Sequence, residues 1–222
     1  MSDRRAAVWG ASGGIGRALV NALASSCDYR LVHAGCRNPV APVSTVVKPF
    51  TFDLLDESSI AAAATALAAV GPVDLTIVAT GMLHDAAGNW PEKSFAALTA
   101  DAMVASFCIN SVGPALIAKH MIQAIPMHRR SVFVALSARA GSISDNQLGG
   151  WHNYRASKAG LNMIIVNLAI ELNARGCLRS PSASILARST PAFPCRSKKG
   201  WQTASCFRQQ IARSTCFRSW ML

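Results

Sequence analysis

The stretch "GASGGIG", residues 10–16, lies between an apolar run over 5–10 and an apolar-periodic segment over 14–26. Its first glycine permits a tight turn after a strand, Gly14 lets the backbone approach a phosphate, and its last glycine lets a helix pack close on that strand. The amino end of such a helix also attracts anions. A flexible glycine loop is the alternative, but a position near the start of an alternating chain favours dinucleotide binding. The predicted cofactor-binding residues of this loop are Gly10, Ser12, Gly14, Ile15 and Gly16.

From residue 5 to about 176 the sequence alternates short apolar runs with helical segments, the pattern of a parallel sheet covered by helices. The expected strands cover 5–10, 30–36, 44–52, 73–80 and 131–137. The expected helices cover 14–26, 57–70, 101–125 and 152–175. The predicted fold class is therefore α/β, a Rossmann-type doubly wound parallel sheet with flanking helices, in one domain over residues 1–176.

The composition fits a folded protein whose charge is unevenly distributed. Hydrophobic residues make up 51% of the 222 residues and charged residues 15%, which is unlike a disordered chain. The formal net charge is +11, yet all 11 Asp and Glu precede Cys177. The basic excess gathers at the end of the chain and forms no patterned face, so no specific nucleic-acid partner is predicted. The apolar runs are too short to predict a membrane span, and the start resembles no leader, so a cytoplasmic location is expected.

Residues 177–222 differ from the rest of the chain. They carry eight Lys and Arg, no Asp or Glu, and four of the seven cysteines. The stretch over 184–207 has no helical or strand periodicity, and 177–189 would make a poor final strand. No CxxC pair occurs in the sequence, so neither a zinc site nor a redox motif is indicated and no metal is expected. These residues are predicted to form an irregular basic tail, with the C-terminal strands of the fold lost or irregular.

The end of the second expected strand indicates which cofactor binds. It reads "AGCRN" and has no acid that would accept hydrogen bonds from a ribose 2′-hydroxyl. Arg37 lies just beyond this strand and Arg17 follows the last glycine of the loop, and two guanidiniums can clamp a 2′-phosphate. NADP(H) is therefore favoured over NAD(H), with two solvated surface arginines as the alternative. Asp53, after the third expected strand, is either a partner of the adenine amino group or an ordinary loop carboxylate.

The segment "YRASK", residues 154–158, places Tyr154 and Lys158 on one face of the last expected helix. A phenol with an ordinary pKa of about 10 is a poor acid at neutral pH, but a nearby ammonium lowers that pKa by ~1–3 units. Such a phenol can donate a proton to a carbonyl oxygen or accept one from an alcohol. The spacing alone is common and usually structural. Together with the glycine loop upstream it indicates a catalytic pair.

With these motifs, residues 5 to about 176 resemble the short-chain dehydrogenase/reductases. The C-factor-like branch is the most similar, through "GMLHD", "INSVGPALIAKH", "SARAGSISDNQLGGW" and "YRASKAGLNM". The resemblance implies an NADP(H)-dependent oxidoreductase acting on a small-molecule carbonyl or alcohol. It implies Tyr154 as the acid/base, Lys158 as the group that lowers its pKa and holds the ribose, and Asn110 as the anchor of a proton-relay water. A homo-oligomer of the family kind is also implied, weakened by the altered C-terminus.

Two departures from the family pattern concern the site. The run after the fourth expected strand, usually Asn-Asn-Ala-Gly, reads "VATG" and keeps only Gly81. The family's catalytic serine position holds Ala138, while Ser137 lies one place early and needs a local twist to reach a substrate, because successive strand side chains face opposite ways. Ser142 is a weaker substitute. The loop "GMLHDAAGNWPEK" either contacts the substrate or forms a packed surface loop, and its side chains of interest are His84, Asp85, Trp90 and Glu92.

The expected function is hydride transfer between a nicotinamide and a carbonyl or alcohol. The alternatives are a nucleotide-binding signalling protein without turnover and an inactive product. The last follows from a hypothesis that the tail is translated in the wrong reading frame. Codons can be chosen for Ser184–Phe207 so that the frame beginning at each third base encodes the Pro-Gly segment expected of the family, which the written frame lacks. The basic residues, the cysteines and the missing acids of the tail fit such an origin.

Overall fold

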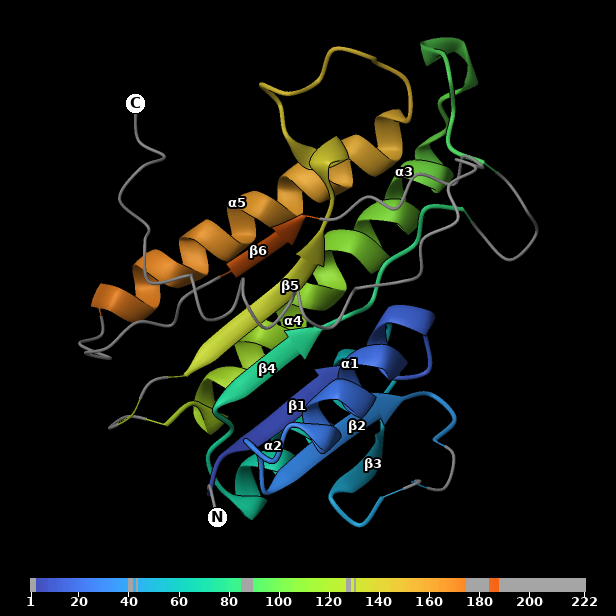
Figure 1. Ribbon diagram of the computed structural model, residues 1–222. Helices are drawn as coiled ribbons and strands as arrows, with labels where there is room; N and C mark the ends of the chain where they lie inside the picture. The colour runs from blue at the N-terminus through green and yellow to red at the C-terminus, as the bar shows by residue number, and fades with distance from the viewer. Residues whose placement is uncertain are drawn as a thin grey trace, which may run out of the picture.

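The computed structural model describes residues 3–39, 42, 44–84, 90–126, 129, 131–174 and 184–187, and a parallel sheet forms the centre of this part of the chain (Figure 1). The strand order is β3-β2-β1-β4-β5-β6, and every neighbouring pair is parallel. This is the order of a Rossmann sheet, so the predicted fold class is confirmed. The strands are β1 Arg5–Trp9, β2 Leu31–Cys36, β3 Val47–Thr51, β4 Leu75–Val78, β5 Val132–Ser137 and β6 Ser184–Ala187.

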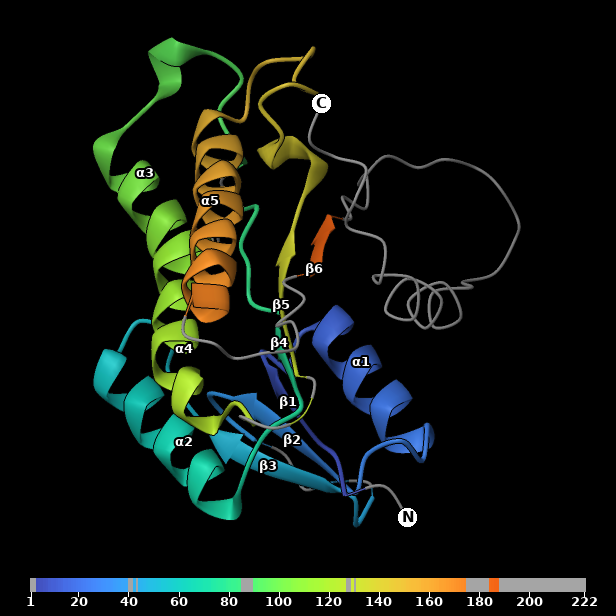
Figure 2. The ribbon, with the colours of Figure 1, turned by 90° about the vertical axis from the view of Figure 1, so that its left-hand side faces the viewer.

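Helices pack on both faces of the sheet. α1 lies on one face, whereas α2, α4 and α5 lie on the other, with α3 alongside α5 (Figure 2). The α-helices are α1 Gly14–Ser25, α2 Glu57–Val70, α3 Ala100–Phe107, α4 Gly113–Met121 and α5 His152–Ala174. The shorter helical turns are η1 Phe95–Ala97, η2 Cys108–Val112, η3 Ile122–Ala124 and η4 Arg139–Gly141.

β1 separates two apolar cores. Val8 packs with residues of α1, whereas Trp9 packs with residues of α2, α4 and α5. A parallel strand buried on both faces reads as a continuous apolar run, which is why "RAAVW" shows no alternation. The Trp9 ring meets Phe50 and Phe52 edge-on, with ring centroids 4.9 and 4.8 Å apart, and so ties the edge strand β3 to the core.

The helix expected over 101–125 is divided into α3, the π-helical turn η2 and α4. Pro114, in the first turn of α4, has no N–H to donate to the carbonyl four residues earlier, that of Asn110. A π-turn within an α-helix is rare and often marks a functional site. Here it contains Asn110, whose side chain is fully buried.

Joined end to end, these pieces give a helical stretch over Ala100–Ala124 with a mean hydropathy of 1.4. By length and composition this stretch is long and apolar enough to cross a membrane, which the separate apolar runs did not reveal. In this fold it packs Ile117 and Met121 into the core, and core helices of soluble proteins meet the same criterion. One such helix is therefore weak evidence for a membrane span.

The strand β6 lies within the stretch expected to form a poor final strand. It pairs with β5 in the register Val134↔Ser184 to Ser137↔Ala187. The lack of strand periodicity over 184–207 did not anticipate these four paired residues. The other predictions for the tail concern residues 175–183 and 188–222, which lie outside the described residues.

Candidate active site

The glycine loop turns at the carboxyl end of β1, beside the end of β4. Gly10 has φ +97°, a conformation that residues with side chains rarely adopt. A Cβ on Gly10 would lie 3.0 Å from the Ala79 carbonyl carbon, and a Cβ on Gly16 would lie 2.1 Å from the Gly10 carbonyl oxygen. A Cβ on Gly14 would have no atom within 4 Å, so this part of the loop faces open space. The carboxyl ends of β1 and β4 form the switch point at which doubly wound sheets bind ligands.

The first turn of α1 offers uncapped amides. Its N-cap is Gly13, which supplies no side-chain hydrogen bond, and no acid lies in its first turn. By contrast, Asp56 accepts from the Ser58 N–H at the start of α2, and Thr99 accepts from the Ala102 N–H at the start of α3. The first N–H groups of a helix lack intrahelical partners, and together with the helix dipole they favour an anion. The start of α1 therefore fits a phosphate.

Two arginines lie next to this loop. The N–H groups of Gly10 and Ala11 donate to the Gly35 carbonyl at 2.9 and 2.8 Å, so the loop sits at the end of β2, two residues before Arg37. Arg37 and Arg17 are both exposed. Among the ion pairs of the described residues, no carboxylate is paired with either guanidinium. Both side chains are therefore available to an anionic ligand.

Asp53 stabilises its own turn. It is exposed after β3, its Oδ1 accepts from the Leu55 N–H at 3.0 Å, and its N–H donates to Ser59 Oγ at 3.0 Å. This is the role of an ordinary loop carboxylate, the alternative considered from the sequence. A contact with adenine stays a prediction.

Gly81, Asn110 and Lys158 converge from three elements. The Asn110 side-chain Oδ1 accepts from the Met82 N–H at 2.9 Å, and its Nδ2 donates to the Met82 carbonyl at 2.9 Å and to Ser157 Oγ at 3.1 Å. This amide therefore joins the loop after β4 to α5. A Cβ on Gly81 would lie 3.3 Å from Lys158 Nζ and 3.4 Å from Asn110 Oδ1. The glycine thus leaves a narrow space in front of the two polar groups.

Lys158 is buried at the centre of this group. Its side chain is on a residue only 3% exposed, and its Nζ donates to the Leu136 carbonyl on β5 at 2.9 Å. Burial lowers the pKa of Lys158 to about 8, because the charged form loses its hydration. A Cβ on Gly141 would lie 2.8 Å from Lys158 Cβ, so only a glycine lets η4 approach α5 this closely.

Tyr154 lies one helical turn before Lys158. Its ring makes an edge contact with Trp151, with centroids 6.4 Å apart. Burial raises the pKa of Tyr154 above its usual value. The sequence analysis expected Lys158 to lower this pKa; here the direction is the opposite, because the desolvation of the phenol prevails and the ammonium is bonded to the Leu136 carbonyl.

The start of α5 is held by Glu92, a role that the sequence did not reveal. Glu92 Oε1 accepts from the Asn153 N–H at 2.7 Å, and the Glu92 carbonyl accepts from the Trp151 N–H at 2.6 Å. Trp151 has φ +53°, a left-handed conformation that is unusual for a bulky residue. The backbone that leads into the helix carrying Tyr154 is therefore fixed by a carboxylate about sixty residues away in sequence, a separation with no local signal.

Ser137 is engaged in the contact between β5 and α5. Its residue is 6% exposed, and its hydroxyl donates to Asn162 Oδ1 at 2.6 Å. Ala138 is also buried, and the Ser142 hydroxyl is used within its own turn. Among the described residues no hydrogen bond connects any of these positions with Tyr154. The structure thus does not bring Ser137 together with the Tyr–Lys pair.

The loop after β4 is partly packed. The rings of His84 and Trp90 lie 5.1 Å apart, although Trp90 is 64% exposed. Glu92 is held by its bonds to the start of α5, and Asp85 lies outside the described residues.

Comparison with known proteins agrees with this geometry. A family model for short chain dehydrogenases matches residues 4–179. The protein C-signal of Myxococcus xanthus is 29% identical over 106 residues, which cover 48% of this chain and 60% of that protein. The chain thus spans about three fifths of the length of this relative.

Similar solved structures share the fold at low sequence identity. The NADPH-bound carbonyl reductase from chicken fatty liver is 22% identical with a TM-score of 0.66, over 79% of this chain and 73% of that one. The carbonyl reductase Sniffer of D. melanogaster is 19% identical with a TM-score of 0.69, over 79% and 77%. A short chain dehydrogenase from Burkholderia cenocepacia in complex with NADP is 22% identical with a TM-score of 0.65, over 78% and 69%. Because the family model spans most of its length, the chain belongs to the short-chain dehydrogenase family of oxidoreductases.

Proposed function

We propose that this chain is an NADP(H)-dependent carbonyl reductase, which runs as an alcohol dehydrogenase in reverse. The convergence of Gly81, Asn110 and Lys158 beside the glycine loop carries the proposal. It puts a buried cation and a fixed amide at the carboxyl ends of the strands, one helical turn from a phenol. A small-molecule carbonyl is the substrate that a phenol can protonate there.

The residues around the loop fit a nicotinamide dinucleotide. The uncapped start of α1, the open side of Gly14 and the available guanidinium of Arg37 suit a pyrophosphate and a 2′-phosphate. When bound, this cofactor supplies or accepts a hydride. The residues proposed to hold it are Gly10, Ser12, Gly14, Ile15, Gly16, Arg17, Arg37, Asp53, Gly81, Tyr154 and Lys158.

The remaining chemistry belongs to side chains of this chain. Tyr154 would donate the proton to the carbonyl oxygen, and a cationic Lys158 would offset the rise in the pKa of Tyr154 caused by burial. Asn110 keeps the loop after β4 fixed to α5 and is proposed to anchor a water that returns the proton. Ser137 would need to exchange its bond with Asn162 for one with the substrate before it could polarise the carbonyl.

The Arg37→Ala substitution tests the choice of cofactor. We expect the Kd for NADPH to rise about 10- to 100-fold, because charge-assisted hydrogen bonds to the 2′-phosphate are lost, while the Kd for NADH changes little. Fluorescence titration measures both values. Arg30→Ala is the matched control, since Arg30 precedes β2, at its opposite end, and pairs with Asp3. Equal losses for both cofactors would make Arg37 a bystander.

The second candidate is a nucleotide-binding signalling protein without turnover. The similarity to C-signal favours it, although that match covers less than half of this chain. NADPH oxidation measured with a panel of aldehydes and ketones separates the two candidates. Turnover supports the reductase, whereas NADPH binding without turnover on any carbonyl supports the signalling protein.

The reading-frame hypothesis makes its own prediction. We expect the coding DNA downstream of Cys177 to encode a Pro-Gly segment in the frame beginning at each third base, and a frame-restored protein to be more soluble and more active on NADPH than this chain. The physical reason is that the restored strands would cover the sheet edge beside β6. A coding sequence without the Pro-Gly segment in that frame would end the hypothesis.

A further inference from the structure

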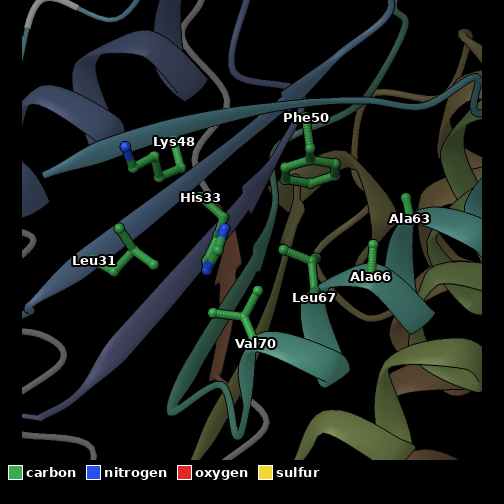
Figure 3. A pocket seen from close by; sticks show the side chains of 8 residues that line it. All are labelled: Leu31, His33, Lys48, Phe50, Ala63, Ala66, Leu67 and Val70. Atoms are coloured by element: carbon green, nitrogen blue, oxygen red, sulfur yellow. The ribbon is translucent and has the colours of Figure 1, made fainter. Parts of the chain in front are cut away.

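A groove lies between β2, β3 and α2, away from the candidate active site. It has a volume of about 370 Å³, within the range of small-molecule sites. Its wall is formed by Leu31 and His33 of β2, Lys48 and Phe50 of β3, and Ala63, Ala66, Leu67 and Val70 of α2 (Figure 3). Leu31 opens β2 and Val70 closes α2, so the groove lies toward the amino ends of the strands, whereas the glycine loop lies at their carboxyl ends.

His33 is the polar group at the centre of this groove. The residue is only 5% exposed, and its Nε2 has no hydrogen-bond partner among the described residues. In Figure 3 the ring projects from β2 toward Leu67 and Val70. A buried polar nitrogen without a partner is costly, and native structures rarely leave one without a reason. A ligand seated in the groove would supply the missing partner.

The charges around His33 select the kind of ligand. Lys48 pairs with His33 in the register of β2 and β3, so both side chains line the same face of the sheet. Arg5 lies behind the groove, where a Cβ on Gly71 would lie 2.0 Å from its Nη2, and it is the charged group that acts on the His33 ring. Burial, and then Arg5, lowers the pKa of His33 to about 4, so the ring is neutral at neutral pH and Nε2 is free to donate. The lining residues include no carboxylate.

The rest of the wall is hydrocarbon. Phe50, Leu67 and Val70 present apolar surface beside the two basic groups, and the groove is open to solvent along the exposed Ala66. A ligand that matches this wall has a negative head and an apolar body. We propose that the groove between β2, β3 and α2 binds an amphipathic monocarboxylate, with its head at His33 and Lys48 and its hydrocarbon along Phe50, Leu67 and Val70.

Titration of the full chain with sodium octanoate, followed by calorimetry, tests this proposal. We expect saturable one-to-one binding, with octanamide at least about tenfold weaker because it lacks the charge that Lys48 neutralises. Lys48→Met should weaken octanoate about tenfold or more and leave octanamide unchanged. Ala66→Phe should block both ligands, because the new ring fills the groove from an exposed position of α2. Neither substitution touches the core, so both variants should keep the fold.

Further measurements assign the site. The ring ¹⁵N signals of the five histidines should show a shift at His33 alone on addition of octanoate, and Tyr154→Phe should bind octanoate as the parent chain does. Absence of binding would overturn the proposal. So would equal binding by Ala66→Phe, equal affinity for octanoate and octanamide, or a ring shift at His84 or His152 in place of His33, since each outcome puts the ligand elsewhere or makes its charge irrelevant.

Discussion

Replacing Tyr154 by phenylalanine is expected to lower kcat for carbonyl reduction by about 10²- to 10⁴-fold, the usual contribution of a general acid. The Kd for NADPH should stay within about twofold, because the substitution removes one hydroxyl and keeps the ring. The ring matters for the fold, since it contacts Trp151 at the start of α5. Steady-state NADPH oxidation and fluorescence titration measure the two quantities.

The chain offers a matched control for this substitution, because it contains only two tyrosines. The pKa of Tyr29 is also raised by burial, and its ring lies 5.2 Å from the Arg4 guanidinium carbon, before the start of β2 and far from α5 in the fold. Tyr29→Phe should leave kcat unchanged. Equal activity of the two variants would remove Tyr154 from the mechanism, and an equal loss in both would indicate a general effect on stability.

The fold was predictable because its signals are local. The all-apolar run of β1, the glycine loop and the alternation of strands and helices each reflect burial on both faces of a parallel sheet. The interruption at η2 was missed, although Pro114 marks it in the sequence. A proline in the first turn of a helix and one within a longer helix look alike until the partner of the preceding carbonyl is known.

The candidate site was only partly predictable, because some of its contacts join distant segments. Tyr154 and Lys158 share a helix, and their spacing is visible in the sequence. The cap that Glu92 provides for α5 and the bond from Ser137 to Asn162 depend on how loops and strands pack, for which no local pattern exists. The direction of the Tyr154 pKa was misjudged for the same reason, since the burial of a phenol is a property of the fold.

Lys158→Met is expected to abolish most of the activity and to change how stability depends on pH. Activity should fall by about 10²-fold or more, because the cation that favours the ionised phenol is lost. The pKa of Lys158 is lowered by burial from 10.5 to about 8. Burying this charge therefore costs roughly 3 kcal/mol of folding stability below pH 8, at about 1.36 kcal/mol for each pKa unit.

The sign of the pH dependence follows from proton binding. Between pH 8 and 10.5 the unfolded chain keeps the Lys158 proton that the folded chain has released, so the stability of the parent protein rises with pH relative to the variant. At pH 7 the methionine variant avoids the cost of burying the charge but leaves the Leu136 carbonyl without its donor, a loss of about 1–3 kcal/mol. The variant should thus be equal to or up to about 2 kcal/mol more stable than the parent at pH 7. It should be less stable near pH 10.5.

Urea unfolding at both pH values measures this crossover, and the difference between the two proteins cancels the titration of all other groups. Lys119→Met is the control, because Lys119 is an exposed partner of Glu57 on α4. Its stability difference should not reverse with pH. A Lys158→Met difference that stays constant from pH 7 to 10.5 would mean that Lys158 titrates in the folded protein as it does in water. The buried cation proposed for the active site would then not exist.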